Sequence, residues 1–198
     1  MTDAPDHEAL LREAIRFEGD GQRALLAGDQ DTARALLREA AEAYRASWQA
    51  APPRAFGRLI GMLKAAVIAG GGVAEAHHVR ELLGEEGDSP PSWYALAIAA
   101  LLLGDDDAAA RAAEGMRDGS PAFVRAADAI AALAAGDDAA YAAAVGAIVE
   151  DFESRDEHLT GVPIADTALM LEELAARRGM AARPASPLLP ACSTDLRD

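Results

Sequence analysis

The 198-residue chain is strongly acidic, with 33 Asp and Glu residues against 18 Lys and Arg residues and a formal net charge of −15. A field of this sign repels nucleic-acid phosphates and anionic lipid head groups, so the composition argues against nucleic-acid and membrane partners. Hydrophobic residues make up 51% of the chain. A chain of this length buries roughly 70% of the surface of its unfolded form, so no disulfide or metal is needed for folding.

The sequence also carries signals of cellular location. The segment MTDAPDHEALL has acidic residues where a secretory signal would have Lys or Arg. The most apolar stretch, 93–103, is shorter than the about 20 residues that span a bilayer. The single cysteine, Cys192, cannot form an intramolecular disulfide. These features predict a cytoplasmic protein.

Helices are the only regular elements that the sequence predicts. Alanine, the best helix former, is abundant, and the β-branched and aromatic residues that strands favour are scarce. Breaks containing Gly or Pro recur at helix-length intervals, at 52–53, 70–72, 84–91, 119–121 and 161–163. The expected fold class is all-α: stacked antiparallel helical hairpins, about nine helices in total.

The first two hairpins are expected around Gly28 and around residue 71. After Gly28-Asp29, apolar residues recur in steps of three and four at Ala33, Leu36, Leu37, Ala40, Tyr44 and Trp48. The next helix shows the same spacing at Phe56, Leu59, Ile60, Leu63 and Val67.

Two further hairpins are expected around Gly104-Asp105 and Gly136-Asp137. In each such turn, Gly permits the left-handed backbone at a helix end, and Asp caps the helix that follows. Ser120-Pro121 is typical of an N-cap followed by a first-turn proline. A ninth helix is predicted from about residue 163 to 178. Residues 1–180 then form one domain, and 181–198 form a Pro-containing tail that packs through Leu188 and Leu189.

The segment 92–121 resembles a tetratricopeptide repeat (TPR), a unit of about 34 residues with two antiparallel helices. The residues that carry this resemblance are Trp93, Tyr94, Leu96, Gly104, Asp105, Ala109 and Pro121. The unit around Gly28 keeps Gly28, Asp29, Ala33 and Ala40, and the unit around Gly136 keeps little beyond its turn. The resemblance implies a TPR-like α-solenoid and leaves function open, because these are packing residues.

The whole chain is also similar to helical immunity proteins of bacterial polymorphic toxin systems. Its length, its acidity and the ending HLTGVPIADTALMLEELAARRG followed by SPLLP carry this resemblance. It implies a protein that binds and blocks one toxin effector.

Sequence motifs for catalysis or metal binding are missing. No Ser lies in a Gly-x-Ser-x-Gly elbow, and no Gly-Lys-Ser/Thr phosphate loop occurs. The pairs Glu75–His78 and His77–Glu81 supply too few ligands for a metal site. The sequence shows no set of polar residues expected to converge between helices. We therefore expect no enzyme activity, no cofactor and no metal.

The densest charge cluster is the acidic run at 150–157. Its members Glu150, Asp151, Glu153, Asp156 and Glu157 are the predicted partner-binding residues. A solvated acidic patch can dock a basic protein or peptide. The predicted function is thus a non-enzymatic interaction module whose helical groove holds a basic partner, with the immunity-type protein as the alternative. Unsealed solenoid ends also favour a homodimer.

Overall fold

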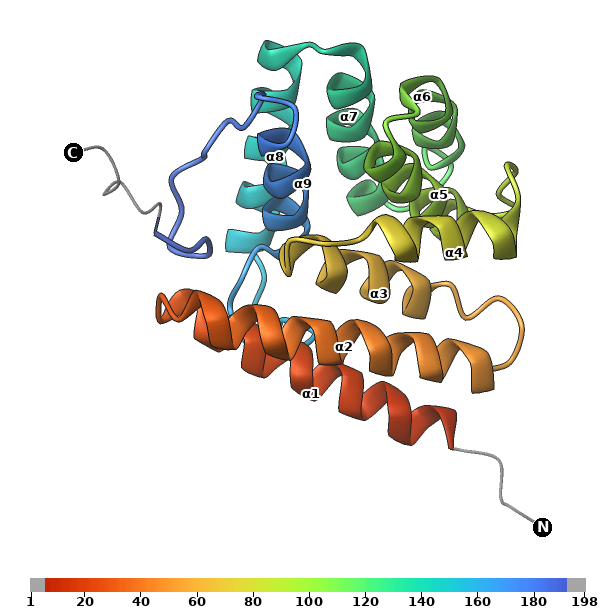
Figure 1. Ribbon diagram of the computed structural model, residues 1–198. Coiled ribbons are helices and arrows are strands. Elements are labelled where there is room, and N and C mark those ends of the chain that lie inside the picture. The colour runs from red at the N-terminus through yellow and green to blue at the C-terminus, as the bar shows by residue number, and fades with distance from the viewer. Residues whose placement is uncertain (1–5, 192–198) are drawn as a thin grey trace.

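The computed structural model describes residues 6–191 and confirms the all-α fold class (Figure 1). The sequence-derived remarks on Cys192 concern a residue outside this range. The helices of the described chain are α1 (His7–Leu26), α2 (Gln30–Ala50), α3 (Gly57–Ile68), α4 (Val73–Leu83), α5 (Pro90–Leu103), α6 (Asp106–Gly115), α7 (Pro121–Ala135), α8 (Asp138–Glu153) and α9 (Asp166–Ala176). No helix between residues 6 and 191 combines the length and apolarity needed to cross a bilayer.

The hairpin turns form as predicted at three Gly-Asp pairs. Gly28, Gly104 and Gly136 all have positive φ angles, between 67° and 80°. The Asp after each glycine is the N-cap of the next helix and accepts a hydrogen bond from a backbone N–H three residues on, at 3.0 to 3.1 Å. The fourth turn, at 70–72, has no such side-chain cap.

Helix α5 contains the aromatic pair of the TPR-like segment. Tyr94 is buried, whereas Trp93 is partly buried between two glycines. A Cβ at Gly87 or Gly115 would lie 2.6 or 2.5 Å from the Trp93 side chain, so the indole requires glycine on both sides. A capping box between Ser89 and Ser92 starts this helix.

The helices pack in a row that the last helix covers. Helix α5 contacts both α3 and α7, and α9 packs against α3, α7 and α8. In Figure 1, α1 to α4 run across the view while α7 to α9 stand steeply to them. Because α9 contacts both α3 and α7, it lies against the two ends of the α3–α5–α7 row.

The predicted start of the last helix is wrong by three residues. The helix begins at Asp166, and residues 160–165 are an irregular segment with Val162 and Ile164 buried. Thr160 does not cap a helix; its hydroxyl donates to the side chain of Gln22. The backbone N–H of Ala165 donates to the carbonyl of Leu188, so the C-terminal segment pairs with the chain where α9 begins.

Two arginines after α9 hold the helix ends together. Arg177 donates to the carbonyls of Val67 and Gly71, and Arg178 donates to the carbonyl of Leu101. Val67 and Leu101 lie in the last turns of α3 and α5, and Gly71 lies in the turn after α3. Leu188 and Leu189 pack against the core.

A glycine in α3 sets how closely that helix approaches α2. A Cβ at Gly61 would lie 2.7 Å from Cζ of Tyr44. We expect Gly61→Ala to lower the free energy of unfolding by about 2 kcal/mol in urea denaturation, because the ring has to shift. Gly146→Ala, in α8 with open space at its Cβ, is the matched control. It should raise stability by about 0.5–1 kcal/mol. Similar effects from both variants would contradict the close approach.

Candidate functional site

The structure separates the five predicted partner-binding acids. Asp151 is partly buried and pairs with Arg125 and with Arg155, while Glu153 accepts a hydrogen bond from Ser186 at 2.7 Å. Glu150 is exposed on α8. Asp156 and Glu157 lie in the α8–α9 loop (154–165), are exposed, and make no ion pair among the described residues.

Beneath that loop lies a cleft made of two adjacent cavities. The larger, of about 290 Å³, lies between α3, α5, α7 and the loop, and we call it the central cavity. The smaller, of about 260 Å³, lies between α1, α2 and α3, and we call it the N-terminal cavity. Their common wall consists of Ile60, Lys64, Leu159 and Asp166.

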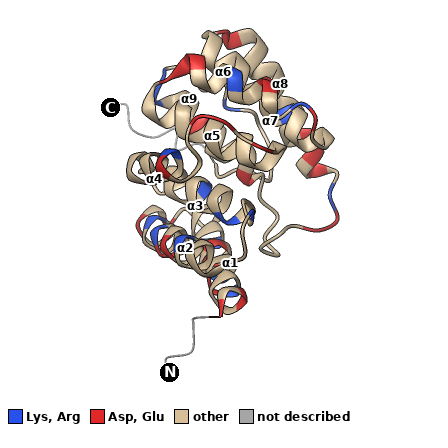
Figure 2. Cartoon of the chain, turned by 90° about the vertical axis from the view of Figure 1, so that its right-hand side faces the viewer, with Lys and Arg blue, Asp and Glu red and all other residues tan. Residues whose placement is uncertain are grey.

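The α8–α9 loop closes the cleft by packing on α1. In Figure 2 it runs along one edge of the molecule from α8 to the neighbourhood of α1. The Thr160 hydroxyl donates to Oε1 of Gln22 at 2.5 Å. A Cβ at Gly19 would lie 3.3 Å from Thr160, so α1 and the loop are in close contact there. Leu159, next to this contact, is 74% exposed while also lining both cavities.

A buried ion pair forms the common wall of the two cavities. Lys64 of α3 donates to Oδ2 of Asp166 at 2.5 Å and to Thr167 at 3.2 Å. Both side chains are mostly buried, at 12% and 15% exposure. Burial alone would lower the pKa of Lys64, but the charge of Asp166, together with Tyr94 and Glu18, outweighs it and raises that pKa above its ordinary value. The ammonium is therefore retained.

A second buried group, Glu18, lies on the N-terminal cavity. Tyr44 donates to its Oε2 at 2.6 Å, and Gln22 donates to its Oε1 at 3.4 Å. Burial, reinforced by the charge of Asp166, raises the pKa of Glu18 to about 7, although Lys64 and Tyr44 act in the opposite direction. This carboxyl group therefore changes its protonation state near neutral pH.

Two polar atoms at the central cavity have no hydrogen-bond partner in the described structure. They are the Tyr94 hydroxyl and Nδ1 of His158. Tyr94 is only 6% exposed; burial and the charge of Asp166 raise its pKa, although Lys64 and a weak contact to the Thr167 hydroxyl act in the opposite direction, so the Tyr94 hydroxyl keeps its proton. A buried hydroxyl without a partner costs about 1–3 kcal/mol.

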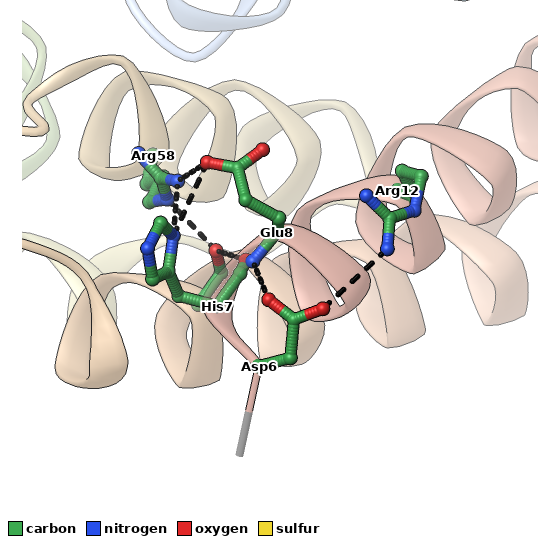
Figure 3. Close-up of polar contacts among 6 residues, drawn as sticks. Asp6, His7, Glu8, Arg12 and Arg58 are labelled. Carbon is green, nitrogen blue, oxygen red and sulfur yellow. Dashed lines mark hydrogen bonds and ion pairs between the residues drawn. The ribbon is translucent and has the colours of Figure 1, made fainter. Parts of the chain in front are cut away.

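A set of polar contacts around Arg58 holds the outer edge of the N-terminal cavity (Figure 3). Arg58, which lines that cavity, donates to Ser47 at 2.8 Å and contacts Nδ1 of His7 at 3.0 Å and Glu8 at 3.2 Å. The Ser47 hydroxyl in turn donates to the carbonyl of His7 at 2.7 Å. The start of α1, the end of α2 and the start of α3 are thereby tied together.

The arrangement of the described residues does not indicate a metal site. Between residues 6 and 191, no three His, Cys, Asp or Glu side chains gather as metal ligands would. Glu75, His77, His78 and Glu81 all lie on α4 and line neither cavity of the cleft.

The expectation that no polar residues converge between helices is wrong. Lys64, Asp166 and Glu18 come from three helices and meet at the cleft. Two signals in the sequence could have indicated this. Lys64 interrupts the otherwise apolar run from Leu59 to Ile68, and Glu18 falls on the buried stripe of α1. A charged residue at such a position needs a buried partner.

The cleft has the features of a binding site: two cavities, a retained ammonium, a carboxyl group that titrates near neutrality, and an unpartnered hydroxyl. The chain matches no protein-family model, and no curated protein or solved structure is significantly similar to it.

Proposed function

We propose that this protein is a non-enzymatic interaction module that binds a basic protein or peptide through the α8–α9 loop at the mouth of the cleft. One observation carries the proposal: Leu159, at 74% the most exposed of the large hydrophobic side chains in the described chain, lies two residues after the unpaired acids Asp156 and Glu157 of that loop. An exposed apolar anchor beside uncompensated charge is typical of contact surfaces.

The ion pairs within the chain indicate which of the predicted acids can contact a partner. Of the five acids in the predicted run, Asp151 and Glu153 are engaged within the chain. Among the described residues, the exposed acids of the run without a side-chain partner are therefore Glu150, Asp156 and Glu157, and the last two lie in the loop beside Leu159. A partner that combines Lys or Arg with an apolar side chain would complement this loop.

The test compares two charge-reversal variants that change the net charge equally. Asp156→Lys/Glu157→Lys alters the loop, and Glu39→Lys/Glu42→Lys alters two exposed acids of α2. In affinity capture from the native lysate at low and moderate salt, we expect the loop variant to lose its dominant basic partner at least tenfold, and the α2 variant to retain it. Equal losses of binding in both variants would mean that the partner responds only to the overall negative charge of the protein. Retention by both would exclude the loop.

The same experiment separates the immunity-type alternative from a peptide-binding module. A single partner that survives moderate salt, and whose toxicity the protein suppresses, would favour the alternative. Several basic peptides released as salt rises would favour the module, because screened contacts between exposed charges weaken with ionic strength.

A further inference from the structure

The central cavity offers more hydrogen-bond donors than acceptors. The two oxygens of Asp166 are engaged by Lys64 and by the hydroxyl of Thr167. Lys64 uses two of its three N–H groups, on Asp166 and Thr167. Tyr94 adds a hydroxyl without any partner. Apart from Nδ1 of His158, which can accept or donate according to its tautomer, the groups left over at this wall are therefore donors.

The side chains that line the central cavity include one more cation than carboxylate. Two permanently cationic side chains, Lys64 and Arg155, line the central cavity, against the single carboxylate Asp166. The chain as a whole carries a formal charge of −15. The Cζ atom of Arg155 lies 3.7 Å from the ring centroid of Phe152. Asp151 accepts hydrogen bonds from Nε and Nη2 of Arg155, so other N–H groups of the guanidinium remain free of Asp151. Both cations are ion-paired, Lys64 with Asp166 and Arg155 with Asp151, so an anion would be held by the N–H groups that these pairs leave free.

The remaining wall is mostly apolar. Its larger apolar residues are Ile60, Phe123, Phe152, Leu159, Val162 and Ile164, and the polar side chains of Gln22, His158 and Thr160 also line the cavity. The volume of about 290 Å³ is at the lower end of the roughly 300–1,000 Å³ found for ligand pockets. The space therefore suits a compact molecule with one ring or a short chain.

We propose that the central cavity binds a small organic carboxylate, whose anionic group accepts hydrogen bonds from Tyr94 and Lys64 and whose apolar body contacts the phenylalanines. The site lies beneath the loop of the proposed partner contact and shares Leu159 with it, but the hydrogen-bond donors that would hold the anion belong to other residues. The carboxylate supplies the acceptor that the Tyr94 hydroxyl lacks. Buried hydroxyls are rarely left without a hydrogen-bond partner. The pocket should therefore prefer a ligand that carries a hydrogen-bond acceptor.

The test is isothermal titration calorimetry of the full chain with matched probes. Phenylacetate and hexanoate are the anionic probes, phenethylamine and hexylamine the cationic ones, and phenylacetamide the neutral one. We expect each carboxylate to bind at least tenfold more tightly than its matched amine, and phenylacetate more tightly than the amide. Equal or tighter binding of the amines, or no binding of either carboxylate at millimolar concentration, would overturn the proposal.

Two tyrosine variants locate the site. Tyr94→Phe removes a hydroxyl that has no partner, so the variant should fold, while its affinity for phenylacetate should fall about tenfold. Tyr141→Phe is the matched control, because its hydroxyl bonds to Glu172 and lines no part of this cavity. It should leave the affinity unchanged. If Tyr94→Phe binds phenylacetate as tightly as the wild type, the proposed position of the carboxylate is wrong.

Discussion

Replacing Lys64 with Met should lower the free energy of unfolding by about 3 kcal/mol, because Asp166 would be left buried without its cation. The two groups lie 2.5 Å apart with exposures of 12% and 15%. At that depth an unpaired carboxylate is poorly solvated. Urea denaturation at neutral pH measures the effect. Arg23→Met, which breaks an exposed pair with Asp20, is the comparison and should change stability by less than about 1 kcal/mol.

The double variant Lys64→Met/Asp166→Asn distinguishes the ion pair from simple packing. With both charges removed, no unpaired charge remains, so the double variant should be more stable than Lys64→Met alone by about 2 kcal/mol. Asn can still form the short-range polar contact to Thr167 that Asp166 makes. If the double variant is no more stable than Lys64→Met, Lys64 contributes through its aliphatic chain and not through its charge.

The hairpins could be predicted from the sequence because their signals are local. Each Gly-Asp pair specifies its own turn, since glycine takes a positive φ and the next residue caps a helix. The start of α9 could not be predicted in this way. Val162 and Ile164 are apolar because an extended segment buries them, and a spacing of two over so few residues does not exclude a helix.

The cleft could not be predicted from the sequence, for a different reason. Lys64 and Asp166 are 102 residues apart, and Gln22 and Thr160 are 138 apart. No local pattern states that these residues meet. The return of α9 onto α3 brings them together, and this tertiary contact depends on the packing of the whole row. The sequence did mark Lys64 and Glu18 as polar residues at apolar positions, without identifying their partners.

Glu18 should make the stability of the protein depend on pH. Its pKa is raised from the ordinary 4.5 to about 7, so between these values the folded state holds a proton that the unfolded state has released. The stabilisation is complete below pH 4.5 and is lost as the pH rises through 7. Relative to the wild type, Glu18→Gln should therefore gain about 3 kcal/mol of stability between pH 4.5 and pH 8. Urea denaturation of both proteins across this range measures the difference, in which the contributions of all other titrating groups cancel.

The variant Tyr44→Phe tests the direction in which the pKa of Glu18 moves. Its hydroxyl donates to Oε2 of Glu18 at 2.6 Å, and this hydrogen bond favours the ionised carboxylate and so lowers the pKa. In Tyr44→Phe the pKa of Glu18 should therefore rise further, and carboxyl ¹³C chemical shifts of labelled Glu would report the titration at higher pH. A titration that moves to lower pH, or a constant stability difference between Glu18→Gln and the wild type from pH 4.5 to 8, would mean that Glu18 is well solvated. The cleft would then be open to water at the very point where the fold buries this side chain.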